Sequence, residues 1–171
     1  MALSVDDDRV RLAVQLAAFA GLRRAEIARI HTRDIEDDCL HVVGKGGHER
    51  LVPLHPELRA ALRAELARRR VGLPGVGWGS TDPRPDGWLF PSDRPGEPIT
   101  AGHIAKLVAA ALPPGFTTHT LRHRFATRAY RVGRDLRAVQ ELLGHAAPET
   151  TARYAAVPDR ALTDAVAGVG V

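Results

Sequence analysis

The sequence is poor in several residue types, and each scarcity excludes a class of protein. It has a single cysteine, Cys39, among 171 residues, which excludes an internal disulfide framework and a cysteine-rich zinc site. It has no run of about 18 or more apolar residues, so no transmembrane helix is expected. Its first eight residues turn acidic at once and lack the basic-then-apolar order of a signal peptide. We therefore expect a cytoplasmic protein.

Lysine and tyrosine are also rare. Of the 24 lysines and arginines, only Lys45 and Lys106 are lysines, and Tyr130 and Tyr154 are the two tyrosines. Such an arginine excess is typical of a GC-rich coding sequence, so each remaining lysine needs its own explanation. The net charge of +4 and the pI near 10.0 are compatible with an anionic partner such as nucleic acid, although many basic domains bind none.

The composition, with 44% hydrophobic residues, is sufficient for one domain with a hydrophobic core. Apolar spacing predicts a first helix ending at Gly21, and further helices over about residues 25–31, 56–70, 101–112, 119–131, 135–143, 147–155 and 158–167. Strand-like runs over 39–43 and 50–54 flank a glycine-rich turn and predict a β-hairpin. Residues 72–98 read as a long loop in which only Trp88, Leu89 and Phe90 are buried. The expected fold is mainly α with one small antiparallel hairpin.

Two basic side chains lie where they could contact a phosphate. Arg23 follows Gly21-Leu22 at the junction of two predicted helices, and a guanidinium there could bind two phosphate oxygens. A salt bridge to Glu26, three residues later, is the simpler explanation of Arg23 alone. Lys45 lies at the hairpin tip, where a solvated lysine is common. Because lysine can lose its proton when its pKa is lowered, Lys45 is also a candidate general acid for a leaving alkoxide.

A third group lies at the start of the helix predicted over 119–131, which Thr118 could cap. His119 and Arg122 are three residues apart and share one face near the helix N-terminus, where phosphates are favoured. His119 and His123 also have the four-residue spacing of a helical zinc pair. We discount a metal because no glutamate follows His119 and because Arg122 would repel a cation. His123 is expected to be a packed or hydrogen-bonded structural residue.

The last group combines Leu142-Leu143-Gly144-His145 with Tyr154, nine residues after the histidine. Gly144 is expected to end one helix, and Tyr154 lies near the end of the next. A lone tyrosine on a helix is usually a half-buried core residue, and Tyr130 is assigned to such packing. Taken by itself, Tyr154 would be assigned in the same way.

Together these segments resemble the catalytic domain of the tyrosine recombinase, or phage-integrase-type, family. The family pattern is an arginine after Gly-Leu, a lysine in a β-hairpin, a His-x-x-Arg box, a Leu-Gly-His box and a tyrosine about nine residues later. Each motif is weak alone, but five in the right order are specific. The chain departs from the pattern at Arg24-Ala25, where a small polar residue often precedes the acid. It supplies all six functional residues of the pattern: Arg23, Lys45, His119, Arg122, His145 and Tyr154.

The resemblance implies a DNA breaking-rejoining enzyme fold and a site-specific recombinase or integrase. Tyr154 would attack a phosphodiester, form a 3′-phosphotyrosyl bond and release a 5′-hydroxyl. The two arginines would neutralise the transition state, His119 would accept the tyrosine proton, Lys45 would protonate the leaving oxygen and His145 would hydrogen-bond the phosphate. Because the covalent bond conserves the energy of the phosphodiester, no ATP, metal or other cofactor is required.

The resemblance also implies partners and a domain organisation. The expected substrate is double-stranded DNA, bound in the nucleoid by a homotetramer on two paired sites. Residues 1–171 are expected to form the catalytic domain, with the family's N-terminal core-binding domain absent. The tail helix over about 158–167 would either dock onto a neighbouring protomer or cover its own core, and the sequence favours neither.

Other functions fit part of the pattern. A type IB topoisomerase uses similar residues to relax DNA, although the Leu-Gly-His box and the short length favour a recombinase. A non-catalytic DNA-binding module would be expected to have lost at least one of the six residues. A metal-dependent nuclease is disfavoured because the motifs contain no convergent cluster of aspartates and glutamates.

Overall fold

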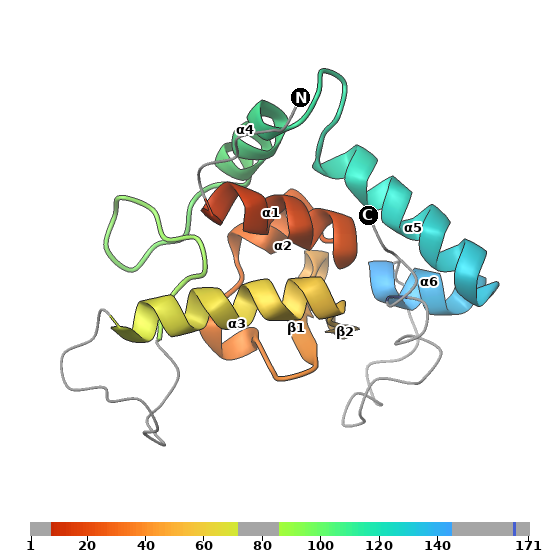
Figure 1. The fold of residues 1–171 in the computed structure, drawn as a ribbon, viewed down its shortest axis with the longest axis horizontal. Coiled ribbons are helices and arrows are strands. Elements are labelled where there is room, and N and C mark those ends of the chain that lie inside the picture. The colour runs from red at the N-terminus through yellow and green to blue at the C-terminus, as the bar shows by residue number, and fades with distance from the viewer. Residues whose placement is uncertain (1–7, 72–85, 145–165, 167–171) are drawn as a thin grey trace.

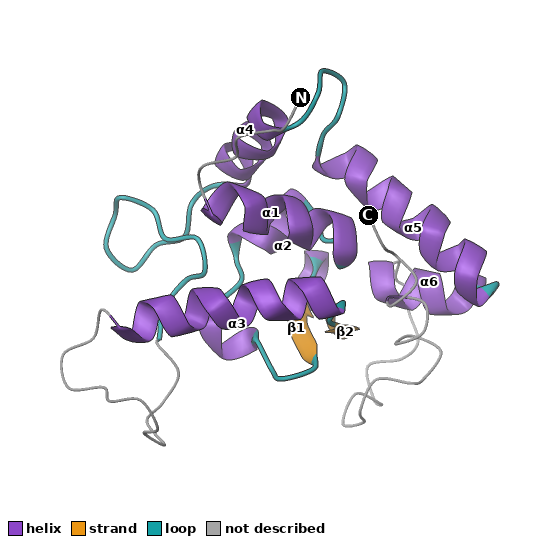
Figure 2. Ribbon diagram, in the orientation of Figure 1, coloured by secondary structure: helices purple, strands orange, loops and turns teal. Residues whose placement is uncertain are grey.

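The computed structural model describes residues 8–71, 86–144 and 166. This part of the chain is mainly helical and has one two-stranded antiparallel sheet, as the sequence predicts (Figure 2). None of its helices is long and apolar enough to cross a lipid bilayer. The elements in chain order are α1 (Asp8–Phe19), α2 (Arg24–Ala28), a 3-10 turn (Thr32–Asp34), β1 (Cys39–Val43), a second 3-10 turn (Lys45–Gly47), β2 (Glu49–Pro53), α3 (Pro56–Val71), α4 (Ala101–Ala111), α5 (Thr118–Gly133) and α6 (Leu136–Leu143).

Helix α1 lies at the centre of the fold and packs against α3, α4 and α5 (Figure 1). It ends at Phe19, and Gly21 stops it as predicted, because this glycine takes a φ of +61° and the Leu22 N–H donates to the Leu16 carbonyl at 3.3 Å. The chain can therefore turn sharply into α2. The buried residues of α1 are Val10, Leu12, Ala13, Leu16, Ala17 and Phe19.

The hairpin pairs β1 with β2 in the register that sets Cys39 opposite Pro53 and Val43 opposite Glu49. Its connection is closed by a 2.7 Å hydrogen bond from the Gly44 N–H to the His48 carbonyl. Strand β2 also packs against α6. The hairpin that carries Lys45 is therefore anchored on the second half of the chain.

The segment before α4 is held by α3. Arg69 donates to the carbonyls of Trp88 and Leu89 at 2.9 and 2.6 Å, and Glu65 pairs with Arg69 at 2.7 Å. The apolar stripe of this helix predicts that its arginines stay in water, and for Arg69 that prediction is wrong. Carbonyls in a buried loop need donors, and Arg69 supplies them. Leu89 and Phe90 are buried as predicted, whereas Trp88 is only half-buried.

Two assignments on α5 were wrong. The cap of this helix is Thr117 rather than Thr118, because the Thr117 hydroxyl accepts from the Thr120 N–H at 3.3 Å. Thr118 is buried instead. Tyr130 is 43% exposed rather than packed, because it lies away from the face on which Phe125 enters the core.

Helix α6 ends at Gly144, as predicted, with a φ of +60°. The helix predicted over 147–155 lies outside the described residues, as do residues 158–165 and 167 of the predicted tail helix. Val166 is helical and only 1% exposed, and it belongs to the same hydrophobic core as α1 and α5. At this residue the tail covers the core of its own chain.

Substitution of Gly21 tests how tightly α1 and α5 meet. In Gly21→Ala, the new Cβ would stand 2.5 Å from Phe125 Cδ1 on a backbone with a φ of +61°. Backbone strain and overpacking together should lower the free energy of unfolding by roughly 2–5 kcal/mol in urea denaturation. Gly115→Ala is the matched control, because Gly115 has a φ of +90° and no atom within 4 Å of its Cβ position. Equal losses in the two variants would contradict the packing argument.

Candidate functional site: an arginine cluster at the end of α6

Four segments that are far apart in the sequence meet at the C-terminal end of α6. Arg50, from β2, donates through Nε to the Leu142 carbonyl at 2.9 Å. Arg23, from the α1–α2 turn, and Arg122, from α5, both donate to the Leu143 carbonyl, at 3.3 and 2.6 Å. The last carbonyls of a helix lack partners within the helix and carry its partial negative charge. Three guanidinium groups satisfy and neutralise them here.

Glu26 is the counter-ion of this arginine cluster, and its side chain is 4% exposed. Arg50 binds both carboxylate oxygens, at 3.0 and 2.9 Å, and Arg23 binds with its guanidinium at 2.9 Å and its backbone N–H at 2.8 Å. Burial acts to raise the pKa of Glu26, but the hydrogen bonds and charge of Arg50 and the hydrogen bonds of Arg23 hold it below the ordinary value of 4.5. Glu26 is therefore an anion at neutral pH.

Arg122 is the more enclosed of the two arginines predicted to bind phosphate, with a side chain 9% exposed. Besides the Leu143 carbonyl, it donates to the Gly21 carbonyl, and it lies 3.8 Å from Glu26. Burial lowers the pKa of Arg122 to about 10, and the charge of Arg23 acts in the same direction. Arg122 is still a cation at neutral pH, because this pKa is well above 7.

Arg23 forms the salt bridge to Glu26 that the sequence offered as the simpler explanation. The same guanidinium nevertheless stands beside that of Arg122 at the Leu143 carbonyl, and 38% of its side chain is exposed. The salt bridge therefore does not exclude a phosphate ligand. It holds Arg23 in place with part of its surface open to solvent.

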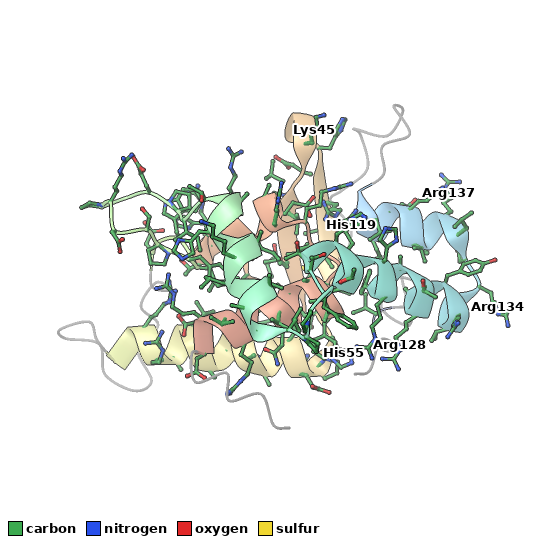
Figure 3. All side chains as sticks on the ribbon, turned by 90° about the horizontal axis from the view of Figure 1, so that it is seen from above. Lys45, His55, His119, Arg128, Arg134 and Arg137 are labelled. Carbon is green, nitrogen blue, oxygen red and sulfur yellow. The ribbon has the colours of Figure 1, made fainter. Side chains whose placement is uncertain are left out.

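Lys45 is exposed at the outer tip of the hairpin (Figure 3). Gly46 and Gly47, which follow it, take φ values of +80° and +79°, a conformation that favours glycine. The structure thus places Lys45 away from the core, in the connection that follows the Val42–Arg50 and Val43–Glu49 pairs. Gly44, at the start of this connection, lies beside the arginine cluster: a Cβ there would stand 3.5 Å from Arg50 Nη1 and 3.6 Å from Glu26 Oε1.

His119 is exposed in the first turns of α5 and pairs with His123. Their Nε2 atoms are 2.9 Å apart and the rings meet edge to face, so one nitrogen donates and the other accepts. The prediction that His123 is hydrogen-bonded is confirmed, although it is not packed in the core. No group of three or more histidine, cysteine, aspartate or glutamate side chains suited to a metal occurs within residues 8–71 and 86–144.

His145 and Tyr154 lie outside the described residues. The residue before His145, however, is placed by the arginine cluster. A Cβ at Gly144 would stand 2.9 Å from Arg50 Nη1 and 3.2 Å from its Cδ and Cζ, so only glycine leaves room for this guanidinium. The chain therefore passes directly from the arginine cluster into His145.

Arg50 belongs to none of the predicted site motifs, yet it is as central to the cluster as Arg23 or Arg122. One signal was available. In the alternating pattern of β2, Arg50 occupies an inward position together with Val52, where an apolar residue is normal. An arginine at such a position predicts a buried partner, and here the partner is Glu26.

Replacement of the Glu26 charge should destabilise the protein strongly. Glu26→Gln leaves buried arginines without an anion, which should cost roughly 3–5 kcal/mol of unfolding free energy at pH 7. The folded pKa lies below 4.5, so this contribution is present above the unfolded pKa and is lost as the pH falls from 4.5 through the folded value. The difference in unfolding free energy between the wild type and Glu26→Gln should therefore become smaller in acid.

Urea denaturation at pH 7 and near pH 3 measures this gap. Glu97→Gln is the control, because Glu97 pairs with Arg94 at 3.7 Å with a side chain 58% exposed. Its loss should cost under about 1 kcal/mol at either pH. A Glu26→Gln gap that stays constant with pH would show that the carboxylate charge does not hold the cluster.

The sequence is similar to those of known integrases and recombinases. The model of the Phage integrase family matches residues 2–160. A putative integrase/recombinase, y4qK, of Sinorhizobium fredii is 37% identical over 143 residues, covering 79% of this chain and 42% of that protein. The tyrosine recombinase XerD of Caulobacter vibrioides is 36% identical over 154 residues, covering 85% of this chain and 48% of that protein.

Solved structures share the fold. The integrase from mycobacterium phage Brujita superposes with a TM-score of 0.69 at 24% identity, over 96% of this chain and 52% of that one. The XerH site-specific recombinase bound to its difH substrate superposes with a TM-score of 0.60 at 29% identity, over 86% of this chain and 42% of that one. The lambda integrase catalytic core superposes with a TM-score of 0.53 at 24% identity, over 85% of this chain and 84% of that one.

The chain spans about half the length of the relatives it matches, 42% of y4qK and 48% of XerD. Its fold is that of the tyrosine recombinase catalytic domain. The family match covers nearly the whole chain, including every described residue of the arginine cluster. The chain belongs to the phage integrase family of tyrosine recombinases.

Proposed function

We propose that residues 1–171 are the catalytic domain of a site-specific DNA recombinase that cleaves and rejoins strands through Tyr154. The observation that carries this proposal is the meeting of Arg23 and Arg122 at the Leu143 carbonyl, at 3.3 and 2.6 Å. Two guanidinium groups that share one acceptor offer adjacent donors to one anion. Such a pair is suited to neutralising both non-bridging oxygens of a phosphate.

The proposed reaction is a transesterification at phosphorus. The Tyr154 oxygen attacks the phosphorus, the bond from phosphorus to the 5′-oxygen breaks, and a 3′-phosphotyrosyl bond forms. His119 accepts the phenol proton, which ordinarily has a pKa of about 10. Lys45 gives a proton to the departing 5′-oxygen, and His145 hydrogen-bonds the phosphate. The reverse attack by a 5′-hydroxyl rejoins a strand, so the energy of the phosphodiester is kept and neither ATP nor a metal is needed.

Exposed arginines on α5 and α6 would supply contacts to the DNA backbone. Arg134 and Arg137 project from the adjoining ends of these helices (Figure 3), and Arg124 and Arg131 are exposed on α5. Contacts of this kind hold any sequence and weaken steeply with salt. Binding of DNA would place the protein in the nucleoid.

A suicide substrate tests the nucleophile. The chain is incubated, in chelator, with a nicked DNA site on which cleavage releases a short strand that cannot rejoin. We expect a covalent protein–DNA band on a denaturing gel for the wild type and at least a hundredfold less for Tyr154→Phe, which lacks the attacking oxygen. Tyr130→Phe is the matched control, because Tyr130 is exposed on α5 and has no part in the step.

Other results of this experiment would contradict the proposed function. A band that survives in Tyr154→Phe would exclude Tyr154 as the nucleophile. A band that requires a divalent metal would point to a different chemistry. Relaxation of supercoiled DNA without strand exchange between sites would favour a topoisomerase. The relatives compared above are integrases and recombinases, which agrees with the proposed activity.

The second proposal concerns assembly, with four protomers on two paired DNA sites. Lambda integrase, which shares the fold, has been solved as a tetramer bound to a Holliday junction. Sedimentation of the chain with DNA that carries two sites should give a species of four protomers, and DNA with one site should give a smaller one. Complexes that never exceed one protomer per site, without pairing of sites, would contradict this proposal.

A further inference from the structure

Arg50 is a buried cation in a strand, and the proposed chemistry gives it no direct role. It lies on β2 opposite Val42, and its side chain is 7% exposed. A buried charge is costly unless it is paired and hydrogen-bonded. The contacts of Arg50 must therefore offset the cost of burying its charge, and they indicate the role of this residue.

These contacts connect the segments that lead to three predicted site residues: Arg23, Lys45 and His145. The guanidinium binds both oxygens of Glu26, at 3.0 and 2.9 Å, and Glu26 in turn holds Arg23. Its Nε donates to the Leu142 carbonyl at 2.9 Å, in the last turn of α6. That turn leads through Gly144 into His145, which the proposed reaction also uses.

The third connection runs through two glycines. A Cβ at Gly144 would stand 2.9 Å from Arg50 Nη1, and a Cβ at Gly44 would stand 3.5 Å from the same atom. Gly44 precedes Lys45, and Gly144 precedes His145. The planar guanidinium thus lies between the backbone segments that lead to these two residues.

We propose that Arg50 is a positioning residue: it fixes the start of the hairpin turn that carries Lys45, the Glu26–Arg23 pair and the end of α6 relative to one another. This inference rests on the proposed function for its effect on DNA cleavage. A planar group with donors in three directions is needed, which arginine provides and lysine does not. With its side chain 7% exposed and its donors directed at Glu26 and Leu142, Arg50 is not a ligand of the phosphate.

The test separates binding from cleavage. Arg50→Lys keeps the charge but cannot bind Glu26 in bidentate fashion and reach Leu142 as well. Displacement of reacting groups by about 1 Å can cost a hundredfold in rate. We expect single-turnover cleavage of the nicked site to slow by about a hundredfold, while the dissociation constant for the DNA site changes less than about threefold, the limit we set for unchanged binding.

Arg59→Lys is the matched control, because Arg59 forms a single salt bridge to Asp38 at 2.6 Å on an exposed surface. Both its cleavage and its binding should match the wild type. Arg50→Gln serves as a second variant if Arg50→Lys does not fold. Weaker DNA binding with a smaller salt dependence would show that Arg50 contacts phosphate and would overturn the proposal. Unchanged cleavage would overturn it as well.

Hydrogen exchange, measured without DNA, tests the role of Arg50 independently of the proposed recombinase function. The Gly44 N–H donates to the His48 carbonyl at 2.7 Å, and the Gly144 N–H donates to the Glu141 carbonyl at 2.9 Å. In Arg50→Lys, hydrogen exchange at these two amides should accelerate at least tenfold, while amides of α1 keep the wild-type rate. A uniform acceleration, or none, would overturn the positioning role. If the wild type forms no covalent product on any site, the proposed function fails, and this measurement still decides the role of Arg50.

Discussion

The buried carboxylate of Glu26 is the interaction on which the rest of the structure depends. Three arginines from separate parts of the chain can approach one another at the end of α6 only if an anion stands among them. Glu26 provides that anion at 4% side-chain exposure, within 3.0 Å of Arg23 and Arg50 and 3.8 Å from Arg122. Without it, the mutual repulsion and the desolvation of these cations would oppose the packing of α5 and α6 against α1 and the hairpin.

This arrangement also explains why the site is built around a helix terminus. The carbonyls of Leu142 and Leu143 accept from the three guanidinium groups, so the end of α6 and the arginines fix each other. Arg23 keeps 38% of its side chain in solvent, whereas Arg50 keeps 7%. The arginines of the cluster therefore differ in exposure. Arg50 is buried and holds the structure together, whereas Arg23 keeps a surface on which an anion can bind.

Local patterns predicted the elements well where the physical cause is local. The first helix ends at a glycine with positive φ, and the strand over 39–43 follows the alternation of its side chains. Two of the errors were also local in origin: the partner of the Thr117 cap is Thr120, three residues later, and Tyr130 lies off the helix face that Phe125 marks. The error at Arg69 was decided by neighbours in space, because this side chain turns to the carbonyls of Trp88 and Leu89, 19 and 20 residues further along the chain.

The sequence by itself determined the family, the order of the motifs and the identity of six candidate site residues, because these depend on residue types at fixed separations. It could not assign Arg23 to a salt bridge or to a phosphate, and it passed over Arg50. The tertiary structure shows the salt bridge of Arg23 and the place of Arg50 in the cluster. Arg23 pairs with Glu26 and still meets Arg122 at the Leu143 carbonyl, and Arg50 closes the cluster from the strand beside them. The reason is physical. A buried charge is stable only when it is paired, and the fold brings the partners of these arginines to them from distant parts of the chain.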